Sequence, residues 1–151
     1  MKHTFLIALL TLIVRLVVAG VFAFAALPKI KDPVAFAASI HDYQFIDGAL
    51  VSWTAVILPW LELTIAVGIL IPTIRRASAA CIGLLLIAFI SLHASAWQRG
   101  LDISCGCFGT ATQPTTDYPL LILRNLALLV AAAWVLWRDC TVKSRTSTIA
   151  H

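Results

Sequence analysis

Charged side chains are scarce in this sequence: of its 151 residues, 12% are Asp, Glu, Lys or Arg, whereas 61% are hydrophobic. This balance lies outside the usual range of soluble globular domains, and it excludes a chain that is surrounded mainly by water. Linkers, internal repeats and low-complexity tracts are lacking as well. The composition therefore predicts one domain, residues 1–151, that is embedded in lipid.

Four stretches are long and apolar enough to cross a membrane, because a hydrocarbon core of about 30 Å needs roughly 20 residues of helix. Inside lipid they must be helices, since an unpaired backbone amide there is too costly. The sequence thus predicts an all-α fold, an integral membrane four-helix bundle. Its helices are expected at Thr4–Leu27, Ala49–Ile71, Ala77–Trp97 and Pro119–Trp137.

The first stretch has some features of a secretory signal. Lys2 precedes it, and Ala23, Phe24 and Ala25 have the small-x-small form of a cleavage site. The apolar run is longer than the ~7–15 residues of a signal core, however, and it contains Arg15. We therefore expect an uncleaved membrane helix.

Lys and Arg are distributed unequally between the two sides of the predicted bundle. Six fall on one side and three on the other, and the richer side should be cytoplasmic. Both termini are then expected in the cytoplasm, and the net charge of +4 is mainly a topology signal and not a nucleic-acid footprint. The cytoplasmic set is Lys2, Arg75, Arg76, Arg138, Lys143 and Arg145, and the outer set is Lys29, Lys31 and Arg99.

The two outer loops differ in character. In the first, Asp32 and Pro33 form a helix-start signal, and Phe36, Ile40 and Tyr43 follow at helical spacing, which predicts a short helix in the membrane interface. The second, Gln98 to Tyr118, is the long polar segment between spans, and Asp117 is expected to cap the fourth membrane helix.

Ionisable groups inside a membrane are candidates for function because they are costly there. Arg15 and Glu62 each lie roughly 14–16 Å from the inner ends of the first and second predicted helices. We expect an ion pair between them, which either fixes the register of the helices or serves a proton or substrate pathway.

His93 and Arg124 match in depth too, each roughly 6–8 Å below the outer boundary on the third and fourth helices. They are predicted beneath the loop that contains Cys105. Either they support chemistry in that loop, or His93 is a hydrogen-bonded interface residue and Arg124 extends its charge outward.

The four cysteines divide by location. Cys81 and Cys140 are expected on the cytoplasmic side as structural thiols that behave as small buried hydrophobic side chains. Cys105 and Cys107 lie together in the outer loop, where two residues of chain hold their Cα atoms about 5.5–7 Å apart, within the range of a disulfide. A ring so small is expected to be strained and to exchange readily.

Two alternatives to an exchanging disulfide stay open: an inert disulfide, and a metal site. A zinc site would need further ligands, and His93 and His41 are the histidines on that side. We therefore expect no metal.

The motifs together resemble the methylamine utilisation protein MauE family and the related DoxX-like four-helix membrane proteins. The resemblance covers nearly the whole chain, and its most specific part is the Cys-Gly-Cys-Phe-Gly loop after Arg-Gly. It is carried by Arg15, Leu27-Pro28-Lys29-Ile30, Asp32-Pro33, Leu58-Pro59-Trp60-Leu61-Glu62-Leu63, Arg99-Gly100, Cys105-Gly106-Cys107-Phe108-Gly109 and Arg124-Asn125.

The resemblance implies a bundle in the bacterial cytoplasmic (inner) membrane, a role in the maturation of methylamine dehydrogenase, and a thioredoxin-like partner or disulfide-rich client outside the cytoplasm. On that basis Cys105 and Cys107 are the expected catalytic residues of a membrane thiol–disulfide oxidoreductase or accessory, with His93, Arg124, Glu62 and Arg15 in support. A quinone is the candidate electron acceptor, although no pattern in the sequence marks its site. A second outer cysteine pair is lacking.

Two other functions compete with thiol chemistry. A non-catalytic membrane subunit or assembly factor would use the same loop to dock a partner. A small-solute transporter fits less well, because paired broken helices are lacking. Membrane lipid is an expected partner in every case, and nucleic acid in none.

Overall fold

The computed structural model describes residues 2–101 and 117–149, and it describes side-chain surroundings for residues 5–101 and 117–141. Every regular element in these ranges is a helix, and four of the five are long and apolar enough to cross a membrane, which confirms the predicted all-α membrane bundle. The helices are α1 (Lys2–Lys31), α2 (Pro33–Asp42), α3 (Ala49–Gly68), α4 (Arg75–Gln98) and α5 (Tyr118–Ile149).

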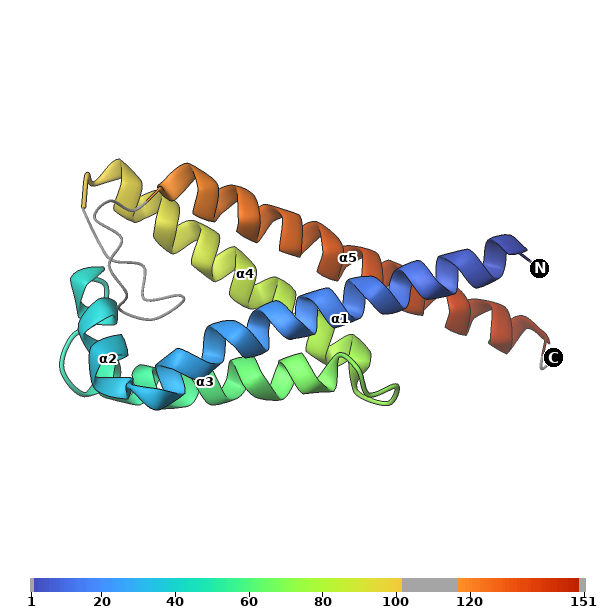
Figure 1. Cartoon of the computed structure of the whole chain (residues 1–151), viewed down its shortest axis with the longest axis horizontal. Coiled ribbons are helices and arrows are strands. Elements are labelled where there is room, and N and C mark those ends of the chain that lie inside the picture. The colour runs from blue at the N-terminus through green and yellow to red at the C-terminus, as the bar shows by residue number, and fades with distance from the viewer. Residues whose placement is uncertain (1, 102–116, 150–151) are drawn as a thin grey trace.

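The four long helices alternate in direction and form a ring (Figure 1). Helix α1 contacts α3 and α5, and α4 contacts the same two helices from the opposite side. The short helix α2 packs on α1 and α3 at one end of the bundle, which we call the α2 end. Both termini lie at the opposite end, which we call the terminal end and which also contains the turn between α3 and α4.

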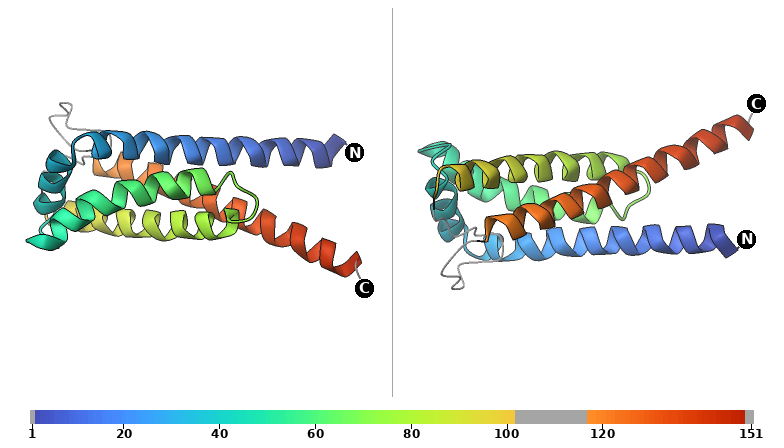
Figure 2. Two further views of the ribbon diagram at one scale, coloured as in Figure 1. Left: turned by 90° about the horizontal axis from the view of Figure 1, so that it is seen from below. Right: turned by 90° about the horizontal axis from the view of Figure 1, so that it is seen from above.

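Helices α1 and α5 extend well beyond the turn between α3 and α4 (Figure 2). The four predicted spans share one level at their inner ends. The structure differs most from the prediction at these ends. Helix α3 ends at Gly68, three residues before the predicted Ile71, whereas α5 continues past the predicted Trp137 to Ile149. Beyond the turn between α3 and α4, the terminal end therefore consists of α1 and α5, whereas all four long helices reach the α2 end.

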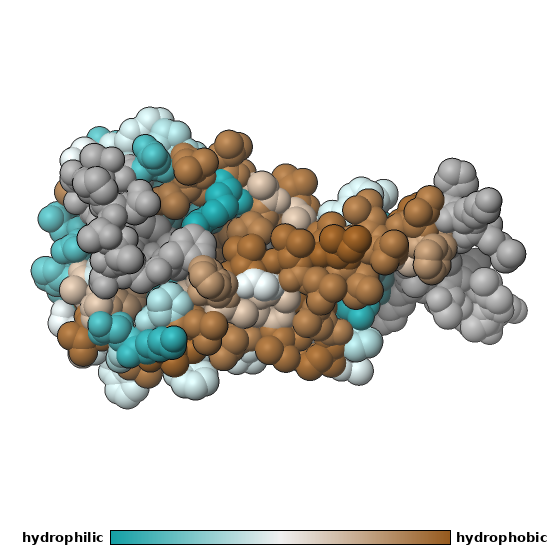
Figure 3. Space-filling view, viewed as in Figure 1, coloured by the Kyte–Doolittle hydropathy of each residue, from teal (hydrophilic) through white to brown (hydrophobic). Residues whose placement is uncertain are grey.

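Apolar side chains fill the bundle and also cover it. The core takes residues from all four long helices, among them Val18, Ile65, Ile82, Leu86 and Val135. Many large apolar side chains face outward as well, and Figure 3 shows hydrophobic surface along the length of the bundle, with hydrophilic residues gathered at the α2 end. A helical bundle that is apolar both inside and outside is suited to lipid.

Helix α1 passes through Pro28 and ends at Lys31, four residues beyond the predicted end. Proline removes a single backbone donor, and the ladder resumes at once, since the backbone N–H of Asp32 donates to the carbonyl of Pro28 at 3.0 Å. Asp32 then caps α2, because its carboxylate accepts a hydrogen bond from the backbone N–H of Ala35 at 2.9 Å. The predicted short helix is confirmed, and Asp32 is the sole residue between the two helices.

The ends of α4 and α5 that flank the second outer loop are well defined. Gly100 adopts a φ of +64°, which favours glycine, and it closes α4 in a Schellman motif: Leu101 N–H donates to the carbonyl of Ala96 and Gly100 N–H to that of Trp97. The backbone N–H of Leu121 donates to the carbonyl of Asp117, so Asp117 occupies the predicted position just before α5.

Candidate functional site

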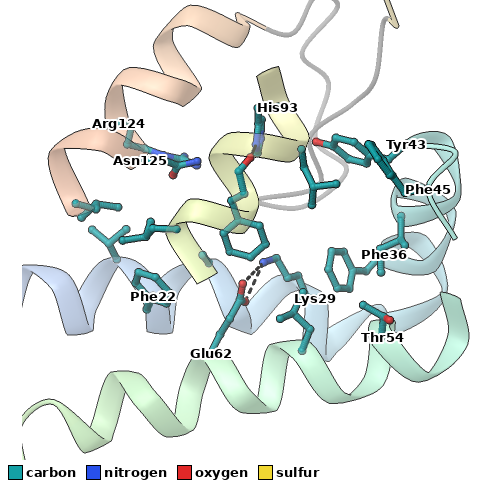
Figure 4. A pocket seen from close by; sticks show the side chains of 18 of the residues that line it. Phe22, Lys29, Phe36, Tyr43, Phe45, Thr54, Glu62, His93, Arg124 and Asn125 are labelled. Carbon is teal, nitrogen blue, oxygen red and sulfur yellow. Dashed lines mark hydrogen bonds and ion pairs between the residues drawn. The ribbon is translucent and has the colours of Figure 1, made fainter. Parts of the chain in front are cut away.

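A cavity of about 270 Å³ lies inside the α2 end of the bundle (Figure 4). All five helices and the turn after α2 contribute to its wall. Most of the lining is apolar, and the polar groups that reach it are few: Lys29 from α1, Tyr43 from the turn after α2, Thr54 and Glu62 from α3, His93 from α4, and Arg124 and Asn125 from α5.

The polar centre of the cavity is an ion pair between Lys29 and Glu62. Lys29 Nζ donates to both carboxylate oxygens of Glu62, at 2.8 Å each. The two side chains are among the most buried charged groups described, with 5% of Lys29 and 1% of Glu62 exposed. A buried charge needs a close opposite charge to offset its desolvation, and each residue supplies this for the other.

Aromatic rings complete the surroundings of the Lys29 ammonium. It lies 5.0 Å from the ring centroid of Phe36 on α2 and 5.6 Å from that of Phe89 on α4. Both distances are within the range of a cation–π contact, which is strengthened when the cation is shielded from water. Lys29 thus connects four helices: its own α1, α3 through Glu62, α2 and α4.

The predicted pair between Arg15 and Glu62 is wrong. Arg15 donates instead to Asp139 Oδ1 at 2.6 Å, at the terminal end of the bundle. Asp139 also lies 3.6 Å from Arg75, and its backbone carbonyl accepts a hydrogen bond from Arg76. Arg15 is therefore part of a cluster between α1, α4 and α5, remote from the cavity.

The error has a physical cause in the unequal helix ends. The predicted pairing assumes that the inner ends of all four spans lie at one level. Because α1 starts at Lys2 and projects past the turn between α3 and α4 (Figure 2), Arg15 lies about 20 Å along its helix. Its partner Asp139 nevertheless also lies beside Arg75 at the start of α4. Glu62 is six residues, or about 9 Å, from the end of α3 and so lies deeper in the bundle.

His93 and Arg124 are brought together, as their matched depth predicted, since both line the cavity. His93 is 3% exposed, and its Nδ1 lies 2.5 Å from the backbone carbonyl of Phe89. A carbonyl can only accept, so Nδ1 carries a proton and the other ring nitrogen, Nε2, is the acceptor in the neutral form. The ring of His93 also packs edge-on against that of Tyr43, with centroids 6.1 Å apart.

Cys105 and Cys107 lie outside the described residues. The chain leaves the described part at Leu101 and re-enters it at Asp117, and both points are at the α2 end. The exit is held in place: Arg99 donates to the carbonyl of Tyr43 at 3.1 Å and to Gln44 Oε1 at 2.9 Å. The hydroxyl of Tyr118 donates to the carbonyl of Leu101, which ties the two ends of the segment together.

Cys81 and Cys140 are not paired with each other or with another described cysteine. Both side chains are exposed on the outside of the bundle, so the expectation that they are buried is wrong. Each lies on a long helix whose outer face is mainly apolar, and a thiol is apolar enough to be placed there. No three His, Cys, Asp or Glu residues gather closely enough to hold a metal ion within the residues that the structure describes.

Sequence reasoning missed three residues with central places. The sequence predicts that the first span ends at Leu27, which places Lys29 in the outer loop. Asp139 was not considered, since it follows the predicted last span. Asn125 was noticed in a motif only. Glu62 could have pointed to Lys29, because a buried carboxylate needs a nearby cation, and Lys29 lies toward the same side of the bundle.

The fold and the site define a multi-pass helical membrane protein with an aromatic cavity around a buried ion pair. The chain belongs to the methylamine utilisation protein MauE family, whose sequence model matches residues 7–138. That range contains every residue that lines the cavity, together with Cys105 and Cys107.

The relatives found by sequence agree with this assignment. The chain is 35% identical over 121 residues to the methylamine utilization protein MauE of Methylophilus methylotrophus, covering 80% of this chain and 64% of that protein. It is 31% identical over 128 residues to the protein of the same name from Methylorubrum extorquens, covering 84% and 68%. The chain thus spans about two thirds of the length of these relatives. No solved structure matches.

Proposed function

We propose that this protein serves methylamine utilisation as a membrane thiol–disulfide redox or maturation protein. Cys105 and Cys107 would exchange with a thioredoxin-like or disulfide-rich client outside the cytoplasm. The names of the relatives support the first part of the proposal. The observation that carries the second part is positional: the segment with the only closely spaced cysteine pair in the sequence is anchored at the α2 end, next to the cavity with His93 and Arg124.

The proposed thiol–disulfide exchange follows from the chemistry of two closely spaced cysteines. The thiolate of one cysteine attacks a disulfide of the client, which releases one client thiolate and forms a mixed disulfide. The second cysteine then attacks the sulfur of its neighbour and releases the other client thiolate. The client disulfide is reduced and a disulfide joins Cys105 to Cys107, and the reverse sequence oxidises the client.

We propose a quinone as the acceptor that returns the pair to its starting state when the client is oxidised. Transfer of two electrons and two protons converts the dithiol and the quinone into a disulfide and a hydroquinone. His93 and Arg124 assist by stabilising the thiolate, since positive charge and a nearby base favour ionised sulfur. Their positions on α4 and α5 are about 8 residues before Leu101 and 7 residues after Asp117, or roughly 10–12 Å along each helix.

The proposed setting is the bacterial inner membrane, with both termini in the cytoplasm and the α2 end outside. Both termini lie at the terminal end with Arg15, Arg75 and Arg76, and cytoplasmic ends of membrane helices are rich in such residues. A membrane-impermeant thiol reagent tests this in intact, reduced cells. Cys107 should react and Cys140 should not, and the opposite result would reverse the orientation.

The redox proposal is tested in a protein that retains only the pair. In a Cys81→Ser/Cys140→Ser background, mass-shift alkylation across a glutathione series should show both remaining thiols titrating together while the protein stays folded. The Cys105→Ser and Cys107→Ser variants should each fail to mature the client, and one of them should trap it as a mixed disulfide. Normal maturation by the double Cys105→Ser/Cys107→Ser variant would leave a docking subunit as the function.

A further inference from the structure

The cavity at the α2 end has the chemistry of a ligand site. Its wall is mostly aromatic and aliphatic, with Phe22, Phe36, Leu58, Phe89 and Leu128 around the buried pair. Water in such a space finds few partners, whereas an apolar molecule contacts the wall on every side. A cavity of about 150 Å³ holds a benzene ring, so 270 Å³ is enough for a substituted ring.

The ion pair in the wall favours a neutral ligand. Lys29 and Glu62 neutralise each other, because the ammonium donates to both oxygens of the one carboxylate. An ionised ligand would lose its hydration on entering the cavity, and this neutral pair offers it no net countercharge.

The side-chain amide of Asn125 is a hydrogen-bond donor in the cavity wall that lacks an acceptor among the described residues. Asn125 is 4% exposed, and its amide Nδ2 is buried without a hydrogen-bond partner among the described residues. Figure 4 shows the side chain reaching from α5 into the space beside α4. Buried amides are nearly always hydrogen-bonded, so a group that arrives with an acceptor oxygen gains a bond that the protein alone leaves unmade.

We propose that this cavity binds a neutral, mainly apolar molecule whose carbonyl oxygen accepts a hydrogen bond from Asn125. The ring carbonyl of a quinone and the ester carbonyl of a membrane lipid share this chemistry. The quinone deepens the proposed function and rests on it, since it would place the electron acceptor at the α2 end. Phe45 lines the cavity and is 53% exposed, so the space reaches the surface there and a hydrocarbon tail can extend outward.

Binding of a decyl-substituted benzoquinone to the purified protein in detergent, followed by calorimetry, tests the proposal. Decylbenzene, which has the same tail and ring without carbonyls, is the comparison ligand. The wild-type protein should bind the quinone about tenfold more tightly than decylbenzene. In Asn125→Leu, which keeps the volume and removes the donor, the quinone should lose most of that advantage while decylbenzene binds as before.

A second pair of variants tests the location. Ala25 lines the cavity from α1, and Ala25→Phe should fill it and weaken both ligands at least tenfold. Ala127 is exposed on the outer face of α5, so Ala127→Phe is the matched control and should change neither. Equal binding of quinone and decylbenzene by the wild-type protein, or unchanged binding by Ala25→Phe, would overturn the proposal.

The two carbonyl sources are separated in nanodiscs. If the quinone binds less tightly in ester-linked phosphatidylglycerol than in its ether-linked analogue, a lipid carbonyl occupies Asn125. Equal affinity in the two assigns the site to the quinone. The Cys105→Ser/Cys107→Ser variant should bind the quinone normally, so a failure of the thiol chemistry and a failure of the cavity proposal give different results.

Discussion

Lys29 and Glu62 form a two-pronged ion pair across α1 and α3, in which one ammonium donates to both oxygens of one carboxylate. The pair is buried between four helices and bordered by the rings of Phe36 and Phe89. Its position makes it both the polar centre of the cavity and the main electrostatic contact between the first two membrane spans.

Removing one member of this pair should strand the other. Lys29→Met and Glu62→Leu are each expected to lower the free energy of unfolding in detergent, by of order 3–5 kcal/mol, because a buried charge loses its partner. The double replacement Lys29→Met/Glu62→Leu should recover much of the loss. A double-mutant cycle should show strong coupling between Lys29 and Glu62 and none between Arg15 and Glu62. Coupling of Glu62 to Arg15 would contradict the observed pairing.

Asp139 is expected to hold the terminal end together. Its carboxylate lies beside Arg15 and Arg75, and Arg76 donates to its backbone carbonyl, so Asp139→Asn leaves the arginine charges without compensation. We expect a loss of about 1–3 kcal/mol in the free energy of unfolding, between the values for exposed and fully buried pairs. The affinity of the cavity for decyl-benzoquinone should not change, and a large change there would contradict the separation of the two sites.

Two glycines offer a matched test of helix packing. A Cβ at Gly68 would collide with Ser78 Oγ and lie within 3.3 Å of two further side-chain atoms, whereas one at Gly20 would meet nothing within 4 Å. Gly68→Ala should therefore separate α3 from α4 and reduce thermal stability. Gly20→Ala should be neutral or raise stability by up to about 1 kcal/mol, since alanine favours a helix over glycine. Equal effects of the two substitutions would argue against close contact at Gly68.

Tyr43 should ionise only in strongly alkaline solution. Burial, and secondarily the nearby Tyr118, raise the pKa of Tyr43 from its ordinary value of 10.0 to about 12. A raised folded-state pKa favours the protonated form, so this contribution to stability is complete below pH 10 and is lost as the pH rises through 12. In Tyr118→Phe, which leaves Tyr43 as the sole tyrosine, tyrosinate absorbance should appear at or just below this range. Its appearance near pH 10 in folded protein would show that Tyr43 is hydrated.

Much of the architecture could be predicted from hydrophobicity, because the backbone of a long apolar segment in lipid must satisfy its own hydrogen bonds and therefore forms a helix. The start of α2 was predictable as well, since Asp32 and Pro33 encode it locally. Pairing was harder. Which cation meets Glu62 depends on the relative heights of α1 and α3, and these are set by packing between helices and by the unequal lengths of their ends. No local pattern reports them.

The same distinction explains the site. His93 and Arg124 were placed together correctly because they lie at similar distances from a shared boundary, the outer loop, on two helices that do end at one level. Lys29 lies beyond the predicted end of the first span at Leu27, whereas the helix continues through Pro28 for a further turn to Lys31. The role of Asn125 follows from its enclosure alone, which only the assembled bundle reveals.

The single-residue corner at Asp32 also has a mechanical consequence. No flexible linker separates α1 from α2. The angle between the two helices is restricted by the Asp32 cap and by two prolines, Pro28 and Pro33, so we expect them to move together. Phe36 on α2 and Lys29 on α1 would then move together. Any displacement of α2 would therefore tilt the first span as well, and it would be transmitted along α1 to the contact between Arg15 and Asp139.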